Sequence, residues 1–230
     1  MAGDDASTRR MKLSTGAEAR VTGPVEHCAV VGLSGGQARE AEGTWGASID
    51  WLVRALSPRL PELGFAEVRY RVKSWRRIES CVDDARAAIE EVGAPRTHLL
   101  GFSKGGAVSI AVAGDPRVEE VVGLAPWIPG QLDVSTLRGK RLTVLHGALD
   151  RWLPGIPGIP ASHSRNGFDR ARERGADGRY VLSPGALHGI ALRTPWGRLV
   201  ALPKAERWAE LVEEELRSFV ASPRRTTIDR

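Results

Sequence analysis

Two kinds of apolar pattern alternate along the chain. Short continuous or alternating apolar segments are typical of β-strands, and longer segments repeat apolar residues every three or four positions, as amphipathic helices do. The first kind predicts strands over 8–13, 18–22, 27–33, 66–75, 97–103, 118–126, 141–147 and 178–184. The second kind predicts helices over 49–56, 78–92, 105–113 and 203–220. A basic helical stretch also surrounds Asp169 and Asp177.

The regular alternation of strand and helix predicts an α/β fold. We expect a three-layer αβα sandwich with a mostly parallel central sheet, in which the first two strands form an edge pair. A chain of 230 residues can bury one sizeable core, so residues 8–221 are predicted to form a single domain. The termini, residues 1–7 and 222–230, are predicted to be disordered.

Composition excludes several classes of partner. The net charge of +5 could indicate nucleic acid, but the arginines are scattered and no basic helix is interleaved with aromatic residues, so no nucleic-acid partner is expected. The N-terminal residues carry no apolar run, and no segment approaches the roughly 20 apolar residues of a membrane span. The sequence therefore predicts a cytoplasmic protein without a membrane partner, either a monomer or a homodimer. Cys28 and Cys81 are expected to be buried free thiols.

One short motif carries candidate chemistry. The segment GFSKGG at 101–106 contains the pattern G-x-S-x-G between a predicted strand and a predicted helix. A serine at such a sharp turn is forced into a strained backbone conformation, and glycines two residues on either side leave room for the turn. The helix that follows directs its free N–H groups and its positive dipole end at the same point, which favours developing negative charge. Ser103 is therefore the candidate nucleophile.

With this motif in place, the chain resembles the α/β-hydrolase superfamily, whose catalytic residues follow the chain order nucleophile, acid, histidine. The segment HGALDRWLP after the strand at 141–147 is similar to the family's acid loop, which makes Asp150 the candidate acid. The segment GALHGI is similar to the family's last loop, which makes His188 the candidate base. The resemblance covers nearly the whole chain and implies no metal and no organic cofactor. Of the other histidines, only His146 is a serious rival for the base.

The resemblance also implies an oxyanion hole. Its two donors would be the backbone N–H of Lys104 and a backbone N–H from the glycine-rich turn GLSGG at 32–36, for which Ser34 is the best candidate. The family commonly begins this turn with histidine and glycine, whereas Gly32 and Leu33 stand there in this chain. Lys104 also replaces the usual apolar neighbour of the nucleophile, and its side chain is expected to be solvated on the first turn of the helix.

The loops predict the substrate pocket. Only about 16 residues separate the strand at 118–126 from the next strand, where many relatives insert a helical cap, so this chain is expected to lack a large cap. The pocket walls would then come from loops. An apolar pocket lined by Leu33, Trp127, Trp152 and Trp196 is one interpretation; simple packing of each tryptophan on the core is equally compatible with the sequence.

The small cap-less pattern is most similar to carboxylesterases and dienelactone-hydrolase-like enzymes, although the latter use cysteine as nucleophile. It implies a serine hydrolase that cleaves an ester or thioester of a small apolar acyl compound through an acyl-enzyme. Acyl transfer and peptide cleavage use the same three residues and stay open. A catalytically degenerate ligand-binding protein is the non-enzymatic alternative, and the altered glycine-rich turn is the feature that favours it.

Overall fold

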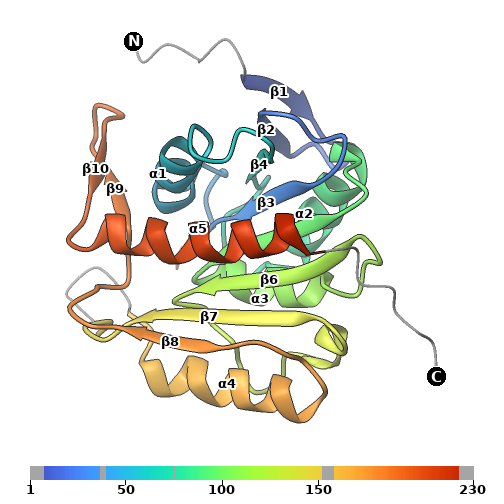
Figure 1. The fold of residues 1–230 in the computed structure, drawn as a ribbon. Coiled ribbons are helices and arrows are strands. Elements are labelled where there is room, and N and C mark those ends of the chain that lie inside the picture. The colour runs from blue at the N-terminus through green and yellow to red at the C-terminus, as the bar shows by residue number, and fades with distance from the viewer. Residues whose placement is uncertain (1–7, 37–39, 75, 152–157, 223–230) are drawn as a thin grey trace.

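The computed structural model describes residues 8–36, 40–74, 76–151 and 158–222. Its centre is an eight-stranded sheet with the strand order β1-β2-β4-β3-β5-β6-β7-β8 (Figure 1). The strands are β1 (Thr8–Lys12), β2 (Glu18–Thr22), β3 (Ala29–Leu33), β4 (Gly64–Arg69), β5 (Thr97–Phe102), β6 (Val118–Leu124), β7 (Arg141–Gly147) and β8 (Tyr180–Ser183). The six strands from β4 to β8 in this order run parallel, and β1 and β2 form an antiparallel edge. The predicted fold class is confirmed.

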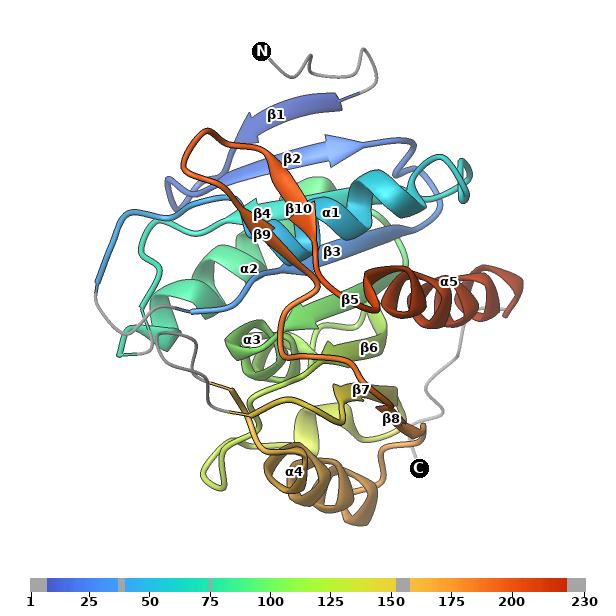
Figure 2. The same ribbon diagram turned by 90° about the vertical axis from the view of Figure 1, so that its left-hand side faces the viewer.

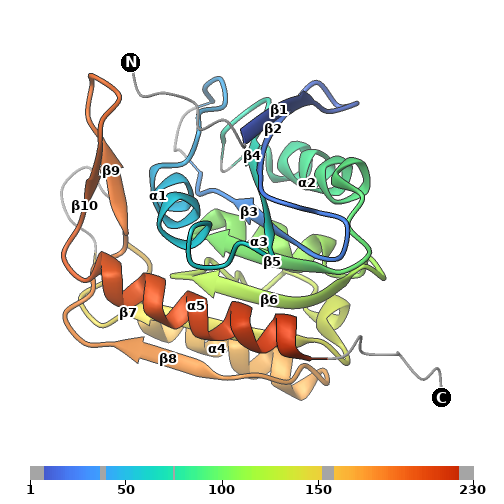
Figure 3. The same cartoon turned by 45° about the horizontal axis from the view of Figure 1, so that its top comes forward.

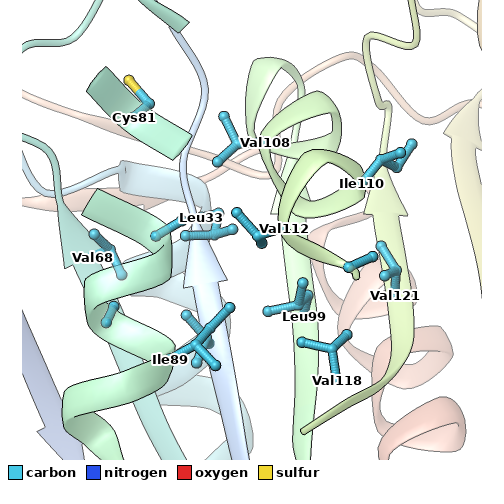
Figure 4. Close-up of a cluster of buried hydrophobic side chains, with 14 of the residues drawn as sticks. Leu33, Val68, Cys81, Ile89, Leu99, Val108, Ile110, Val112, Val118 and Val121 are labelled. Carbon is cyan, nitrogen blue, oxygen red and sulfur yellow. The ribbon is translucent and has the colours of Figure 1, made fainter. Parts of the chain in front are cut away.

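Helices cover both faces of the sheet. They are α1 (Ala47–Leu56), α2 (Ile78–Val92), α3 (Lys104–Val112), α4 (Ala161–Glu173) and α5 (Ala205–Ala221). The buried residues of α2, α3 and α4 pack in one apolar cluster, and those of α1 and α5 pack in a second cluster on the opposite face. Figure 4 shows part of the first cluster, in which Cys81 and Ile89 of α2 and Val108 and Val112 of α3 are drawn with Leu33, Leu99 and Val121 of the sheet. Cys28 and Cys81 are both buried and free, as expected.

The strand β4 occupies residues 64–69, whereas the alternation of apolar residues predicts a strand over 66–75. The end of the prediction is wrong because the chain leaves the sheet after Arg69 and pairs with a loop instead. Lys73 donates its N–H to the carbonyl of Ala41, and Gly43 donates to the carbonyl of Arg71. An alternating pattern cannot distinguish pairing with a strand of the sheet from pairing with the loop at 41–43, since both leave every second side chain buried.

A two-stranded hairpin, absent from the sequence predictions, follows the last strand of the sheet. It consists of β9 (Ala191–Arg193) and β10 (Leu199–Ala201), and it lies over α1 (Figure 2). The hydroxyl of Ser48 on α1 accepts hydrogen bonds from the N–H groups of Ile190 and Ala191 at 3.1 and 3.4 Å. Between β6 and β7 the chain forms only the short 3-10 helix Ser135–Leu137, so no large cap stands at that point.

A buried carboxylate lies beneath α1 at the β2–β4 pair. Glu67 on β4 is 1% exposed, and its carboxylate contacts the guanidinium of Arg20, which lies 2.8 Å from Asp50. Burial raises the pKa of Glu67 to about 7, and the nearby charge of Asp50 acts in the same direction against the attraction of Arg20. Glu67 therefore holds a proton at pH values where an ordinary glutamate is ionised.

This raised pKa predicts a pH-dependent stability. Between pH 4.5, the ordinary value for glutamate, and about 7, the unfolded chain loses the Glu67 proton while the folded chain keeps it. The free energy of unfolding should therefore fall as pH rises through this window. Glu67→Gln should flatten that slope and raise the free energy of unfolding at pH 8 by up to about 3 kcal/mol. Urea denaturation at pH 5 and pH 8 measures both values. The exposed Glu79→Gln serves as control, and a slope unchanged in Glu67→Gln would contradict the prediction.

Candidate active site

The segment predicted to hold the nucleophile forms a sharp turn between β5 and α3. Ser103 has φ 55° and ψ −118°, a backbone conformation that a residue with a side chain rarely adopts. Three hydrogen bonds involve its backbone: its N–H donates to Leu124, and its carbonyl accepts from Gly106 and Trp127, all at 2.9 Å. The strain at Ser103 is thus held by the neighbouring strand β6 and by the loop that follows it.

The turn also needs glycine on both sides of Ser103. A Cβ on Gly101 would stand 2.4 Å from the hydroxyl of Ser109 and 2.5 Å from the carbonyl oxygen of Gly105. A Cβ on Gly105 would stand 2.0 Å from the carbonyl oxygen of Leu33 at the end of β3. The two glycines therefore allow α3 to begin in close contact with the backbones of β5 and β3, which brings Ser103 to the carboxyl edge of the sheet.

The structure brings the three predicted catalytic side chains together. His188 lies with Nε2 3.1 Å from the hydroxyl of Ser103 and with Nδ1 2.7 Å from Oδ2 of Asp150. Because an ionised carboxylate only accepts hydrogen bonds, Nδ1 carries the proton and Nε2 is left to accept from the serine. The Asp150 side chain is fully buried and that of His188 is 12% exposed. This arrangement can remove the serine proton during attack on a carbonyl carbon.

The Asp150 carboxylate has three hydrogen-bond donors. Besides His188, the backbone N–H of Ile159 donates to Oδ1 at 3.0 Å, and Nε2 of His146 lies 3.1 Å from Oδ2. Burial favours the protonated acid, yet the hydrogen bonds from the two histidines outweigh burial and lower the pKa of Asp150 below its ordinary range. Asp150 is therefore ionised at neutral pH, as an acceptor from His188 must be.

His146 is the residue near the site whose position the sequence did not reveal. The sequence makes His146 a rival candidate for the base, but its contacts run to the acid Asp150. Nε2 lies 2.9 Å from the carbonyl of Ile159 as well as near Asp150, and Nδ1 lies 2.8 Å from the hydroxyl of Ser164. The imidazole is fully buried at the end of β7. The only available signal was its spacing, four residues before Asp150 across a tight turn.

Ser164, His146 and Asp150 thus form a second serine–histidine–aspartate chain that shares the same acid. Ser164 lies on α4 and is 0% exposed, and its hydroxyl also lies within hydrogen-bond distance of Tyr180 and of the carbonyl of Ala161. A buried hydroxyl with these partners cannot reach a substrate. Ser103, 4% exposed at the sheet edge, is the serine of the two that can.

The contact between His146 and Asp150 predicts a positioning effect. His146→Phe removes one donor from the carboxylate that orients His188, so kcat/KM for an ester should fall about tenfold to hundredfold, the usual worth of a hydrogen bond to a charged group. His146→Gln, which can restore an N–H donor, should recover part of the loss. Ser164→Ala leaves the donor to Asp150 in place and should cost less. Steady-state kinetics of the three variants measure these losses. Equal losses of kcat/KM in all three variants would refute the predicted order.

The predicted oxyanion turn lies beside the nucleophile. A Cβ on Gly35 would stand 3.4 Å from Cβ of Ser103, so the segment after β3 borders the reacting hydroxyl. Ser34 is buried in this turn, and Lys104 begins α3, whose first N–H groups have no acceptor within the helix. The structure thus brings both predicted backbone donors to the neighbourhood of Ser103. Their role in an oxyanion hole stays a prediction.

The side chain of Lys104 is not solvated, and that expectation is wrong. Lys104 is 0% exposed: its ammonium lies 2.8 Å from the sulfur of Cys81 and 3.2 Å from the carbonyl of Ser74, and it stands 4.9 Å from the centre of the Tyr70 ring. The chain turns the side chain inward between α2 and α3, where these groups replace water around the charge. Its charge therefore does not face incoming substrate.

An apolar cavity of about 200 Å³ opens beside His188. Its walls come from the strand before Ser103, the loop of Asp150, the loop of His188 and the hairpin: Phe102, Leu149, Leu187, Ala191, Leu192 and Leu202, with Ser48 and Arg151 among the polar groups. The Phe102 ring is 5.2 Å from the His188 ring. The cavity is therefore continuous with the candidate catalytic residues.

Leu33, Trp127 and Trp196, which are predicted to line the pocket, are not among the residues that line this cavity, and their role in substrate binding stays a prediction. Leu33 is fully buried in the core, and Trp127 is half-buried and donates its backbone N–H to the carbonyl of Ser103. Trp196 is 89% exposed at the tip of the hairpin. Trp152 lies outside the described residues. The walls of the cavity beside His188 come mainly from aliphatic residues near Asp150 and His188.

Three solved structures have a similar fold. An α/β serine hydrolase homologue from Coxiella burnetii is 18% identical, with a TM-score of 0.63 over 94% of this chain and 100% of its own. A lid-less α/β serine hydrolase from Xanthomonas campestris is 15% identical, with a TM-score of 0.64 over 96% and 98%. A dienelactone hydrolase from Anabaena variabilis is 15% identical, with a TM-score of 0.61 over 92% and 98%. No protein-family model and no curated protein sequence matches the chain.

Proposed function

We propose that this chain, which has the α/β-hydrolase fold without a large cap, is a serine hydrolase that cleaves an ester or thioester of a small apolar acyl compound. The observation that carries the proposal is the unbroken chain of hydrogen bonds from Ser103 through His188 to Asp150. The strained turn at Ser103 adds to it, because strain of this kind persists where the surrounding structure holds a functional group in place.

In the proposed mechanism, His188 Nε2 takes the proton of Ser103 as its oxygen attacks the carbonyl carbon of the substrate. Asp150 keeps the imidazole in the required tautomer and stabilises the imidazolium. The N–H groups of Lys104 and Ser34 stabilise the oxyanion. The proton then passes from His188 to the leaving alcohol or thiol, and an acyl-enzyme remains on Ser103. Water, activated by the same histidine, releases the acid and restores the serine.

The cavity beside His188 supports an apolar substrate group. Its walls are mostly aliphatic and it holds about 200 Å³, which suits a short acyl or aryl group rather than a long chain. The Lys104 ammonium is buried away from this cavity, so it does not select anionic substrates. A series of p-nitrophenyl esters of increasing acyl length should show the highest kcat/KM for the short members.

The test of the proposal is labelling of Ser103 by a fluorophosphonate, read by intact mass. The wild type should gain one label, and Ser103→Ala none. Ser164→Ala is the matched control, because it removes the serine of the second chain, and it should be labelled like the wild type. If the folded wild type takes up no label and turns over no ester or thioester, the hydrolase proposal fails and a ligand-binding protein becomes the better hypothesis. Label retained in Ser103→Ala would show that a different residue reacts.

A further inference from the structure

Most of the large apolar side chains that are exposed among the described residues lie on the β9–β10 hairpin or in the loop of Asp150. Among the described residues, five large apolar side chains are exposed: Leu149, Leu182, Leu192, Trp196 and Val200. Three of them lie on the β9–β10 hairpin or its turn, and Leu149 lies in the loop of Asp150. Only Leu182 on the edge strand β8 belongs to neither segment. Clustered exposed apolar residues, unlike scattered ones, mark an interaction surface.

The hairpin continues the cavity outward. Leu149 and Leu192 line the same cavity, and Leu192 stands opposite Val200 in the hairpin, so the two side chains share one face. The alternate residue Arg193 is turned toward α1, where it pairs with Asp50, and Ala191 is buried where the base of the hairpin meets both α1 and the cavity. One face of the hairpin is thus anchored, and the other extends the apolar wall of the cavity to the surface. Figure 3 shows the hairpin projecting from the body of the protein.

The same region is cationic. Residues 180–205 include Arg193, Arg198 and Lys204 and contain no aspartate or glutamate, and the next residue, Glu206, pairs with Arg59. Within the described ranges, neither Arg198 nor Lys204 makes an ion pair, and Arg151 at the cavity wall makes none either. Trp196 stands two residues before Arg198 at the tip, 89% exposed. An aromatic tip, an apolar face and unpaired cations are the combination that binds at the headgroup region of an anionic lipid surface.

We propose that the β9–β10 hairpin docks the protein on an anionic lipid surface, with Trp196 and Val200 in the headgroup region and Arg198 beside the lipid phosphates. Lys204, which stands between the base of the hairpin and α5, adds positive charge next to it. The sequence predicts no membrane partner, because it shows no anchor, no segment of spanning length and no pattern that supports surface binding. Among the described helices none is long and apolar enough to cross a bilayer, and docking of this kind needs no such helix. The mouth of the cavity would then face the lipid. This docking does not depend on the proposed hydrolase function.

The test is co-sedimentation of the full-length protein with vesicles at low ionic strength. The test vesicles contain phosphatidylcholine and about 30% phosphatidylglycerol, which is enough for a strong negative surface charge. These vesicles should pellet the protein, and vesicles of pure phosphatidylcholine should pellet much less of it. Each basic residue near such a surface contributes about fivefold in affinity, so Arg198→Glu/Lys204→Glu should weaken binding at least about twentyfold. Trp196→Ser/Val200→Ser should also weaken it. Leu182→Ser is the matched control, since Leu182 and Leu192 are both 48% exposed, and it should bind like the wild type.

The outcomes are distinguishable. Equal pelleting with both kinds of vesicle, no pelleting at all, or a loss in Leu182→Ser as large as that in the hairpin variants would overturn the proposal. Sedimentation velocity without lipid provides a further check. A dimer that Trp196→Ser/Val200→Ser dissociates would assign the face to a second copy of the chain instead. Ser103→Ala should bind vesicles like the wild type, so failure of docking and failure of the hydrolase proposal are read from separate experiments.

Discussion

Replacing His188 with alanine should lower kcat/KM for an activated ester by about 10⁴-fold or more, because the variant loses the proposed base for Ser103, which is also the proposed acid for the leaving group. The loss should lie in kcat, since His188 forms only one wall of the cavity proposed to bind the substrate. Stopped-flow or steady-state hydrolysis of a short p-nitrophenyl ester measures it.

The side chain of His188 is 12% exposed and lies at the edge of the core, so the variant should keep its fold and its unfolding midpoint within a few degrees. His163→Ala on α4 is the matched control, because that histidine lies outside the chain of hydrogen bonds that reaches Ser103. A His188→Ala enzyme within about tenfold of wild-type activity would exclude His188 as the base and direct attention to His146.

Gly105→Ala should destabilise the fold by about 3–5 kcal/mol, the range of severe packing changes. The added Cβ would stand 2.0 Å from the carbonyl oxygen of Leu33, 2.7 Å from its carbonyl carbon and 2.9 Å from the carbonyl oxygen of Ser34. All three are backbone atoms, so no side chain can rotate away, and α3 must separate from β3. Because α3 begins next to Ser103, activity should fall even at temperatures where the variant is folded.

Gly114→Ala is the matched control for this prediction. Gly114 follows α3, its Cβ would find its nearest neighbour at 4.0 Å, and its φ is not positive. This variant should be within about 1 kcal/mol of the wild type. Urea denaturation compares the two. Equal stabilities for Gly105→Ala and Gly114→Ala would mean that the close approach of α3 to β3 is not required for folding.

The features predicted from sequence were those that local pattern determines. Continuous apolar runs indicated the buried strands β3, β5 and β7, because a strand covered on both faces has no polar alternation. The strand–turn–helix context made Ser103 the candidate nucleophile. In the structure, His188 lies within hydrogen-bond distance of both the Ser103 hydroxyl and the Asp150 carboxylate. In a parallel sheet, loops that follow neighbouring strands meet at one edge, which is why chain order alone could suggest this grouping.

The features that sequence missed depend on distant contacts. The strands β9 and β10 have three residues each, too few to show a period, and the hairpin is held by Ser48 and Asp50, which lie about 140 residues earlier in the chain. The orientation of Lys104 was missed for the same reason. Its ammonium is stabilised by Cys81, Ser74 and the Tyr70 ring, and no pattern around residue 104 reveals that these groups lie beneath it.

The hydroxyl of Ser48 has a mechanical consequence for the site. It holds the N–H groups of Ile190 and Ala191, the second and third residues after His188, at the point where the hairpin leaves the body of the protein. Arg193 on the hairpin also pairs with Asp50 of α1, so the hairpin is fastened to this helix at two points. The chain that leaves His188 is therefore fixed to α1 within three residues of the imidazole.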